Sequence, residues 1–146
     1  MESMQQLDHV YISHAHTDHV GYLPQLMQIA PQASVYMTLQ TKQLAEYRLI
    51  ANSSQTGAAE ASRLLSNVAP VNYLQKIKQR DYHSHLFPGR VISPALLMTL
   101  FEYAGRKILY TGDYSLQSAF GLDGCWLPDD LEVDVLLICA LHAKQP

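Results

Sequence analysis

The stretch Ser13-His14-Ala15-His16-Thr17-Asp18-His19 decides how this chain is interpreted. His14 and His16 are two residues apart, so in an extended strand end their side chains project to the same side. Asp18 lies two residues further on, and His19 follows it directly. Neutral imidazole and carboxylate oxygen are the ligands that zinc takes in open, catalytic sites. The pattern therefore predicts a metal site at this loop.

Two metal ions fit this loop better than one, because the side chains of alternating residues point in two different directions. We expect His14 and His16 to bind one ion, and Asp18 and His19 to bind the other. The alternative is a polar surface loop that is rich in histidine by chance. Three of the seven histidines of the chain fall inside this window. A predicted strand before the loop and a helix after it favour the metal site.

The rest of the sequence predicts an α/β layered domain of mixed element order. A strand over residues 8–13 leads into the histidine loop, and a helix capped by Asp18 or Thr17 runs to about Ile29. The apolar run 133–140 is typical of a buried central strand. Residues 95–103 and 107–111 are expected to pair as a β-hairpin. Residues 81–89 indicate a loop or short strand. A further strand is expected at 34–37, and helices at 38–50 and 57–67.

The composition is that of one folded domain spanning residues 1–146, with 48% hydrophobic and 16% charged residues. The net charge of −3 gives no basic footprint for nucleic acid, although a local groove or a metal can still bind RNA. The two cysteines, Cys125 and Cys139, indicate a reducing compartment. No apolar run approaches the ~20 residues that cross a bilayer. We therefore expect a cytoplasmic protein with no membrane partner.

The histidine loop matches the HxHxDH signature of the metallo-β-lactamase superfamily. The next residues, Val20-Gly21-Tyr22-Leu23-Pro24-Gln25-Leu26, resemble the β-CASP branch, whose members process RNA or DNA. That branch has a threonine-marked helix after a short strand, where this chain has Thr38, Thr41 and Leu44.

A second motif extends the resemblance. Leu109-Tyr110-Thr111-Gly112-Asp113-Tyr114-Ser115 is similar to the later GD motif of the family, whose aspartate bridges two metals. The resemblance thus implies a metal ligand set made of the residues His14, His16, Asp18, His19 and Asp113. It also implies a metallo-β-lactamase-like αββα layered fold.

The chain departs from the family pattern in three places. Arg90 stands where the family has a histidine ligand of the first metal, and a guanidinium has no lone pair to donate. Either His83 or His85 substitutes, or the first site is weakened, although each is more simply a core or surface histidine. After the last strand the family has an ESTYG-like segment, and here Cys139-Ala140-Leu141-His142 follows.

The third departure is the extent of the match. Strands that precede the signature and a nucleic-acid-gripping domain that follows it in the family have no counterpart here. The chain thus resembles about half of the αββα domain. An apolar face would then be covered by a second copy, in a homodimer, or by a partner chain.

The resemblance implies a metal-dependent hydrolase, a zinc phosphodiesterase or ribonuclease of β-CASP type with two zinc ions. Its substrate would be RNA or another phosphodiester, and Asp18 would orient the nucleophile or accept its proton. One alternative keeps the fold and acts on a small thioester, lactone or lactam. The other is a catalytically degenerate domain that serves as a binding or assembly module.

Overall fold

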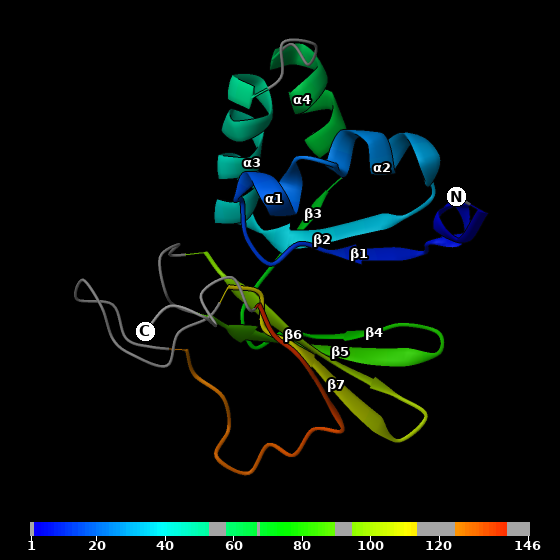
Figure 1. The fold of residues 1–146 in the computed structure, drawn as a ribbon, viewed down its shortest axis with the longest axis vertical. Helices are drawn as coiled ribbons and strands as arrows, with labels where there is room; N and C mark the ends of the chain where they lie inside the picture. The colour runs from blue at the N-terminus through cyan, green and yellow to red at the C-terminus, as the bar shows by residue number, and fades with distance from the viewer. Residues whose placement is uncertain (1, 53–57, 67, 90–94, 114–124, 140–146) are drawn as a thin grey trace. The chain divides into compact units, whose positions relative to one another are not determined.

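A computed structural model describes residues 2–52, 58–66, 68–89, 95–113 and 125–139. The chain divides into two compact units, Met1–Asn72 and Tyr73–Pro146, of which the first carries the histidine loop. Each unit has its own sheet, and Figure 1 shows the elements of both.

The first unit is built on a parallel sheet of three strands in the order β1-β2-β3. Its helices lie together on one face of that sheet (Figure 1). The 3-10 helix η1 precedes the first strand. The elements are η1 Glu2–Gln6, β1 His9–Tyr11, α1 Thr17–Val20, α2 Leu23–Ile29, β2 Ser34–Thr38, α3 Leu39–Asn52, α4 Ala58–Ser66 and β3 Ala69–Val71.

Alternation along the strands places the core of this unit under the helices. Val35 and Met37 on β2 are buried, and Ile12, just past β1, joins the same cluster. Burial of each large apolar side chain stabilises the folded state by roughly 1.5–3 kcal/mol. Helices α3 and α4 add Ala45, Leu49, Ala61 and Leu65 to the cluster. The predicted strands at 8–13 and 34–37 and helices at 38–50 and 57–67 are confirmed to within two residues at their ends.

The prediction of one continuous helix from the histidine loop to Ile29 is wrong. The structure has two short helices, with α1 ending at Val20 and α2 beginning at Leu23. Pro24 explains the break, because it has no N–H to donate to the carbonyl of Val20 and its ring would clash there. The predicted cap is also wrong. His16 is the N-cap residue of α1, and no side chain caps this end.

The second unit is a five-stranded sheet in the order β4-β5-β6-β7-β8. Neighbouring strands are antiparallel except for β7 and β8, which are parallel. The predicted hairpin is confirmed, with Ala104 and Gly105, both at positive φ, as its turn. Residues 81–89 contain a full strand. The bounds are β4 Lys76–Lys78, β5 Tyr82–Pro88, β6 Leu97–Tyr103, β7 Arg106–Tyr110 and β8 Val135–Leu137.

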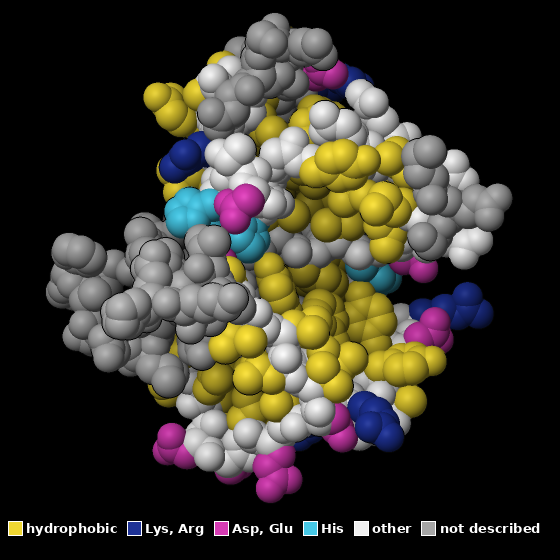
Figure 2. All heavy atoms as spheres, in the orientation of Figure 1, with side chains coloured by type: hydrophobic (Ala, Val, Ile, Leu, Met, Phe, Trp, Pro, Cys, Tyr) yellow, Lys and Arg dark blue, Asp and Glu magenta, His cyan; other side chains and the backbone are white. Residues whose placement is uncertain are grey.

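The apolar core of this unit forms where the segment before β8 lies over the sheet. Phe87, Met98, Leu100 and Leu109 are its buried members. Side chains from the segment before β8 pack against them, namely Cys125, Leu127, Leu131 and Val133. Hydrophobic side chains of this unit are visible in Figure 2.

The prediction that 133–140 is a buried central strand is wrong for its described part. Only Val135–Leu137 forms a strand, and among the described residues it is an edge strand that pairs with β7 alone. Its three side chains are 42–51% exposed. An apolar run indicates that a segment favours burial, but the order of strands decides how many neighbours it has. The expected second copy or partner chain over an apolar face remains a prediction.

Candidate metal centre

The histidine loop is held between β1 and α1. The N–H of Ile12 donates to the carbonyl of Tyr36 at 2.9 Å, which extends the β1–β2 pairing by one residue. His16 then opens α1, because its carbonyl accepts from the N–H of His19 at 2.9 Å and of Val20 at 3.0 Å. The strand end therefore positions His14, and the first helical turn positions Asp18 and His19.

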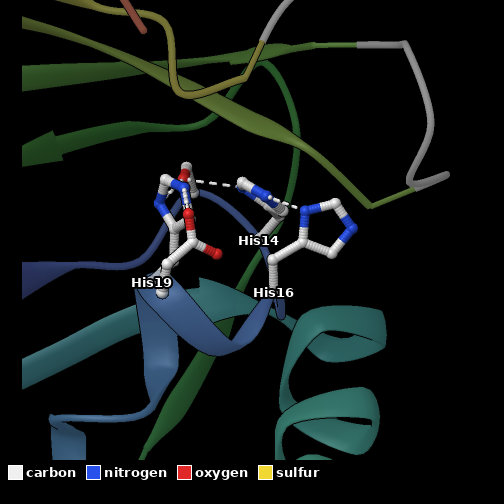
Figure 3. A network of polar contacts seen from close by, with 5 residues as sticks. His14, His16 and His19 are labelled. Carbon is white, nitrogen blue, oxygen red and sulfur yellow. Dashed lines mark hydrogen bonds and ion pairs between the residues drawn. The ribbon is translucent and has the colours of Figure 1, made fainter. Parts of the chain in front are cut away.

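His14 and His16 direct ring nitrogens at one another. Nε2 of His14 lies 2.8 Å from Nδ1 of His16, and the two rings meet edge to face (Figure 3). Two ligands of one tetrahedral zinc, at Zn–N distances near 2.0–2.1 Å, have nitrogens roughly 3.3 Å apart. A small opening of the pair, together with loss or transfer of the proton that lies between the two nitrogens, would therefore direct both lone pairs at one ion. His14 is buried, so its ring is fixed by its surroundings.

Asp18 and His19 form a second pair. Oδ2 of Asp18 lies 3.5 Å from Nε2 of His19, and the Asp18 side chain is 70% exposed while that of His19 is 18% exposed. The His14 and His19 rings lie side by side, with centroids 4.1 Å apart. The structure thus brings the four predicted ligands of the loop together as two adjacent pairs. Their binding of metal remains a prediction.

Ser13 is a residue of this cluster that the sequence analysis did not assign. Its side chain is buried, with Oγ 3.0 Å from Nδ1 of His14 and 3.4 Å from Nδ1 of His19. The only signal for it in the sequence is its place directly before the first histidine.

Asp113 lies in the second unit, three residues after the end of β7. Gly112 adopts a φ of 59°, which is the left-handed conformation that glycine takes readily, so the predicted glycine turn is present. The strand end is fixed by the N–H of Thr111, which donates to the carbonyl of Leu137 at 3.1 Å. Asp113 is partly buried. Its role as the bridging ligand remains a prediction.

His83 and His85, the two histidines considered as substitutes for Arg90 in the metal site, lie on strand β5. Nε2 of His85 lies 2.8 Å from Oε2 of Glu102 on the neighbouring strand, and His83 is exposed on the same strand as His85. Both observations favour the interpretation of core or surface histidines, with His85 partly buried in an ion pair and His83 at the surface. Arg90 itself and His142 lie outside the described residues.

Comparison with known proteins places the chain in a family. The profile of the Metallo-beta-lactamase superfamily matches residues 5–145. The chain is 32% identical to the endoribonuclease YSH1 of Candida glabrata, over 90% of this chain and 19% of that protein. It is 31% identical to cleavage and polyadenylation specificity factor subunit 3 of Dictyostelium discoideum, with 95% and 19% covered. The probable RNase MJ4 of Methanocaldococcus jannaschii is 31% identical, with 93% and 34% covered. The chain spans about a fifth to a third of these relatives.

Solved structures agree on the fold. The MIM-2 metallo-β-lactamase superposes with a TM-score of 0.63 at 20% identity, over 97% of this chain and 58% of that one. Rubredoxin oxygen:oxidoreductase of Desulfovibrio gigas gives 0.57 at 16% identity, with 76% and 24% covered. These neighbours confirm the predicted metallo-β-lactamase-like fold class. In the described part of the chain, no helix has the length and apolar character to cross a membrane. The chain belongs to the metallo-β-lactamase superfamily and, by its motifs and curated relatives, resembles the β-CASP branch.

Proposed function

We propose that this chain is the metal-binding part of a zinc-dependent ribonuclease of β-CASP type, which hydrolyses the phosphodiester bond of RNA. The observation that carries the proposal is the convergence of Nε2 of His14 on Nδ1 of His16 at 2.8 Å, beside the second pair of Asp18 and His19. Curated relatives named as an endoribonuclease and a probable RNase support RNA as the substrate class.

The donor set suits a pair of zinc ions. Imidazole nitrogen and carboxylate oxygen are zinc ligands, and a site with few protein ligands leaves room for water. His14 and His16 would hold one ion, Asp18 and His19 the other, and Asp113 would contribute a carboxylate to both. Bound zinc supplies a Lewis acid that activates water and stabilises charge on a phosphoryl oxygen.

Among these proposed ligands, Asp18 would also take part in the proton transfer. Its carboxylate is mostly exposed, so the oxygen that does not face His19 is open to solvent and to a substrate. An ionised carboxylate accepts hydrogen bonds only, so this oxygen can orient a water molecule or take its proton. In the proposal Asp18 is therefore both ligand and proton acceptor.

Zinc content of the purified chain tests the metal part of the proposal. We expect close to two zinc ions per chain by plasma mass spectrometry. The double variant His16→Ala with His19→Ala should lose tight binding. The free energy of binding a structural zinc is about 10–16 kcal/mol, so each of four ligands accounts for roughly 3 kcal/mol or about a hundredfold in affinity.

The matched control is the double variant His83→Ala with His85→Ala, which also removes two histidines but outside the loop. It should keep the zinc content of the parent. Equal zinc content in the loop variant and the parent would refute the site. One ion or none in the parent would favour the degenerate binding module.

Substrate assays separate the remaining alternatives. Zinc-loaded protein should cleave RNA, and Asp18→Asn should lower the rate by about 10²–10⁴-fold if Asp18 accepts the proton. Hydrolysis of a thioester, lactone or lactam without RNA cleavage would reassign the substrate class.

Two further variants address the residues that complete the site. Asp113→Asn should weaken zinc binding, and unchanged affinity would remove Asp113 from the ligand set. Arg90→His should raise zinc occupancy, and identical titrations of the variant and the parent would show that Arg90 does not take the place of a ligand.

A further inference from the structure

Ser13 contacts one histidine of each pair. Its Oγ lies 3.0 Å from Nδ1 of His14 and 3.4 Å from Nδ1 of His19, and only 3% of the residue is exposed. It stands just past the end of β1, where Ile12 is tied to β2, so its backbone is anchored. A single buried hydroxyl therefore lies between the rings of His14 and His19.

The nitrogens that face Ser13 differ from those that face the proposed metals. On His14, Nε2 is directed at His16, and on His19, Nε2 is directed at Asp18. A neutral imidazole carries its proton on one nitrogen and a lone pair on the other. If both Nε2 atoms offer lone pairs, both Nδ1 atoms must carry protons. A serine oxygen has two lone pairs and can accept from both N–H groups.

We propose that Ser13 is a positioning residue that holds His14 in the Nδ1–H tautomer and, once zinc is bound, holds His19 in the same tautomer. It does not touch the metals but fixes which nitrogen of each ring is available to them. Because one hydroxyl serves both rings, it also couples the orientations of the two pairs. This inference rests on the proposed metal ligation by the loop.

His16 differs from His14 because it contacts its partner through Nδ1 and not through Nε2. With Nδ1 of His14 protonated, Nε2 of His14 is an acceptor, so the 2.8 Å contact requires His16 to donate from Nδ1 in the metal-free protein. Binding of metal through Nδ1 of His16 then requires that proton to leave or move to Nε2. The network thus predicts that His14 keeps its tautomer when zinc binds, whereas His16 changes. His19 changes as well, because in the metal-free protein its Nε2 faces the carboxylate of Asp18, which can only accept, while its Nδ1 accepts from Ser13.

Partners that orient the ligands of a metal typically contribute about 10–100-fold to its affinity. Ser13→Ala removes the acceptor and should weaken zinc binding by about that factor. Ser13→Thr keeps the hydroxyl and should restore the affinity of the parent. Ser13→Val has nearly the shape of threonine without the hydroxyl, so it should resemble Ser13→Ala.

Ser84→Ala is the matched control, because Ser84 is also fully buried but lies on β5 in the second unit. It should leave zinc affinity unchanged even if it lowers the stability of the fold. Affinity is measured by competition with a chromophoric chelator.

Tautomers are read from long-range ¹H–¹⁵N spectra of the imidazoles, in the metal-free protein and after zinc is added. We expect Nδ1–H at His14 in both states, Nδ1–H at His19 only when zinc is bound, and a change at His16. Ser13→Ala should give mixed tautomers at His14.

Nε2–H at His14 in the parent, or at His19 in the zinc-bound parent, would overturn the proposal, and this measurement needs no variant to fold. Equal zinc affinity in the Thr and Val variants would also overturn it. If the parent binds no zinc, the proposed function fails, whereas the tautomer of His14 in the metal-free protein still decides whether Ser13 fixes that ring.

Discussion

Removal of one buried hydroxyl at the start of α3 should destabilise the first unit measurably. Oγ1 of Thr38 accepts from the N–H of Thr41 at 3.1 Å, and the two hydroxyls are 2.9 Å apart. Both residues are buried to about 99% or more. Thr38→Val keeps the branched shape and removes only the polar atom, so cavity effects stay small.

The loss has two parts. The missing N-cap contributes about 1 kcal/mol. The N–H and hydroxyl of Thr41 lose this partner in a buried place, which contributes about 1–3 kcal/mol. The expected decrease in the free energy of unfolding is therefore about 2–4 kcal/mol. With a urea dependence of about 2 kcal/mol/M, the unfolding midpoint should fall by about 1–2 M.

Thr41→Val is the matched comparison, because it removes the hydroxyl contact and keeps the capped N–H. It should lose about 1 kcal/mol. The double variant should lose less than the sum, since the two residues share one contact. Urea titrations followed by circular dichroism give all three values. A loss in Thr38→Val that is equal to or smaller than that in Thr41→Val would refute the capping argument.

Three further outcomes are expected in the second unit. Ala104→Asn should raise the free energy of unfolding by about 0.5–1 kcal/mol in urea titrations, because Ala104 has a φ of 49° that asparagine tolerates better. An unchanged free energy of unfolding would mean that the turn is unstrained. Asp134→Ala should lower the free energy of unfolding by about 0.5–1.5 kcal/mol in the same titrations, because Oδ2 of Asp134 accepts from the N–H of Lys107 at 2.7 Å. Asp134→Asn keeps an acceptor and is the control that should lose less. Burial raises the pKa of the Cys125 thiol, so maleimide should label Cys125 more slowly than exposed Cys139 near neutral pH. The labelling rate at Cys125 should rise with pH as thiolate forms. Equal labelling rates at the two cysteines, measured by peptide mass spectrometry, would contradict this.

Local sequence determined the histidine loop and most of the elements around it. Candidate ligand residues at short spacing between a strand and a helix need no distant contact to be recognised, so His14, His16, Asp18 and His19 could be identified from the sequence. The hairpin was accessible for the same reason, because its strands are joined by two turn residues. The break before α2 was also encoded locally, in Pro24, but the apolar pattern across it suggested one helix.

Tertiary structure decided what depends on residues far apart in the chain. The apolar run at 133–140 gives no information on its neighbours, and only strand pairing made β8 an edge strand beside β7. Ser13 carries no ligand chemistry in the sequence. Its role appears only when the turn from β1 into α1 brings its hydroxyl between His14 and His19, because hydrogen bonds form over about 3 Å and are set by three-dimensional position.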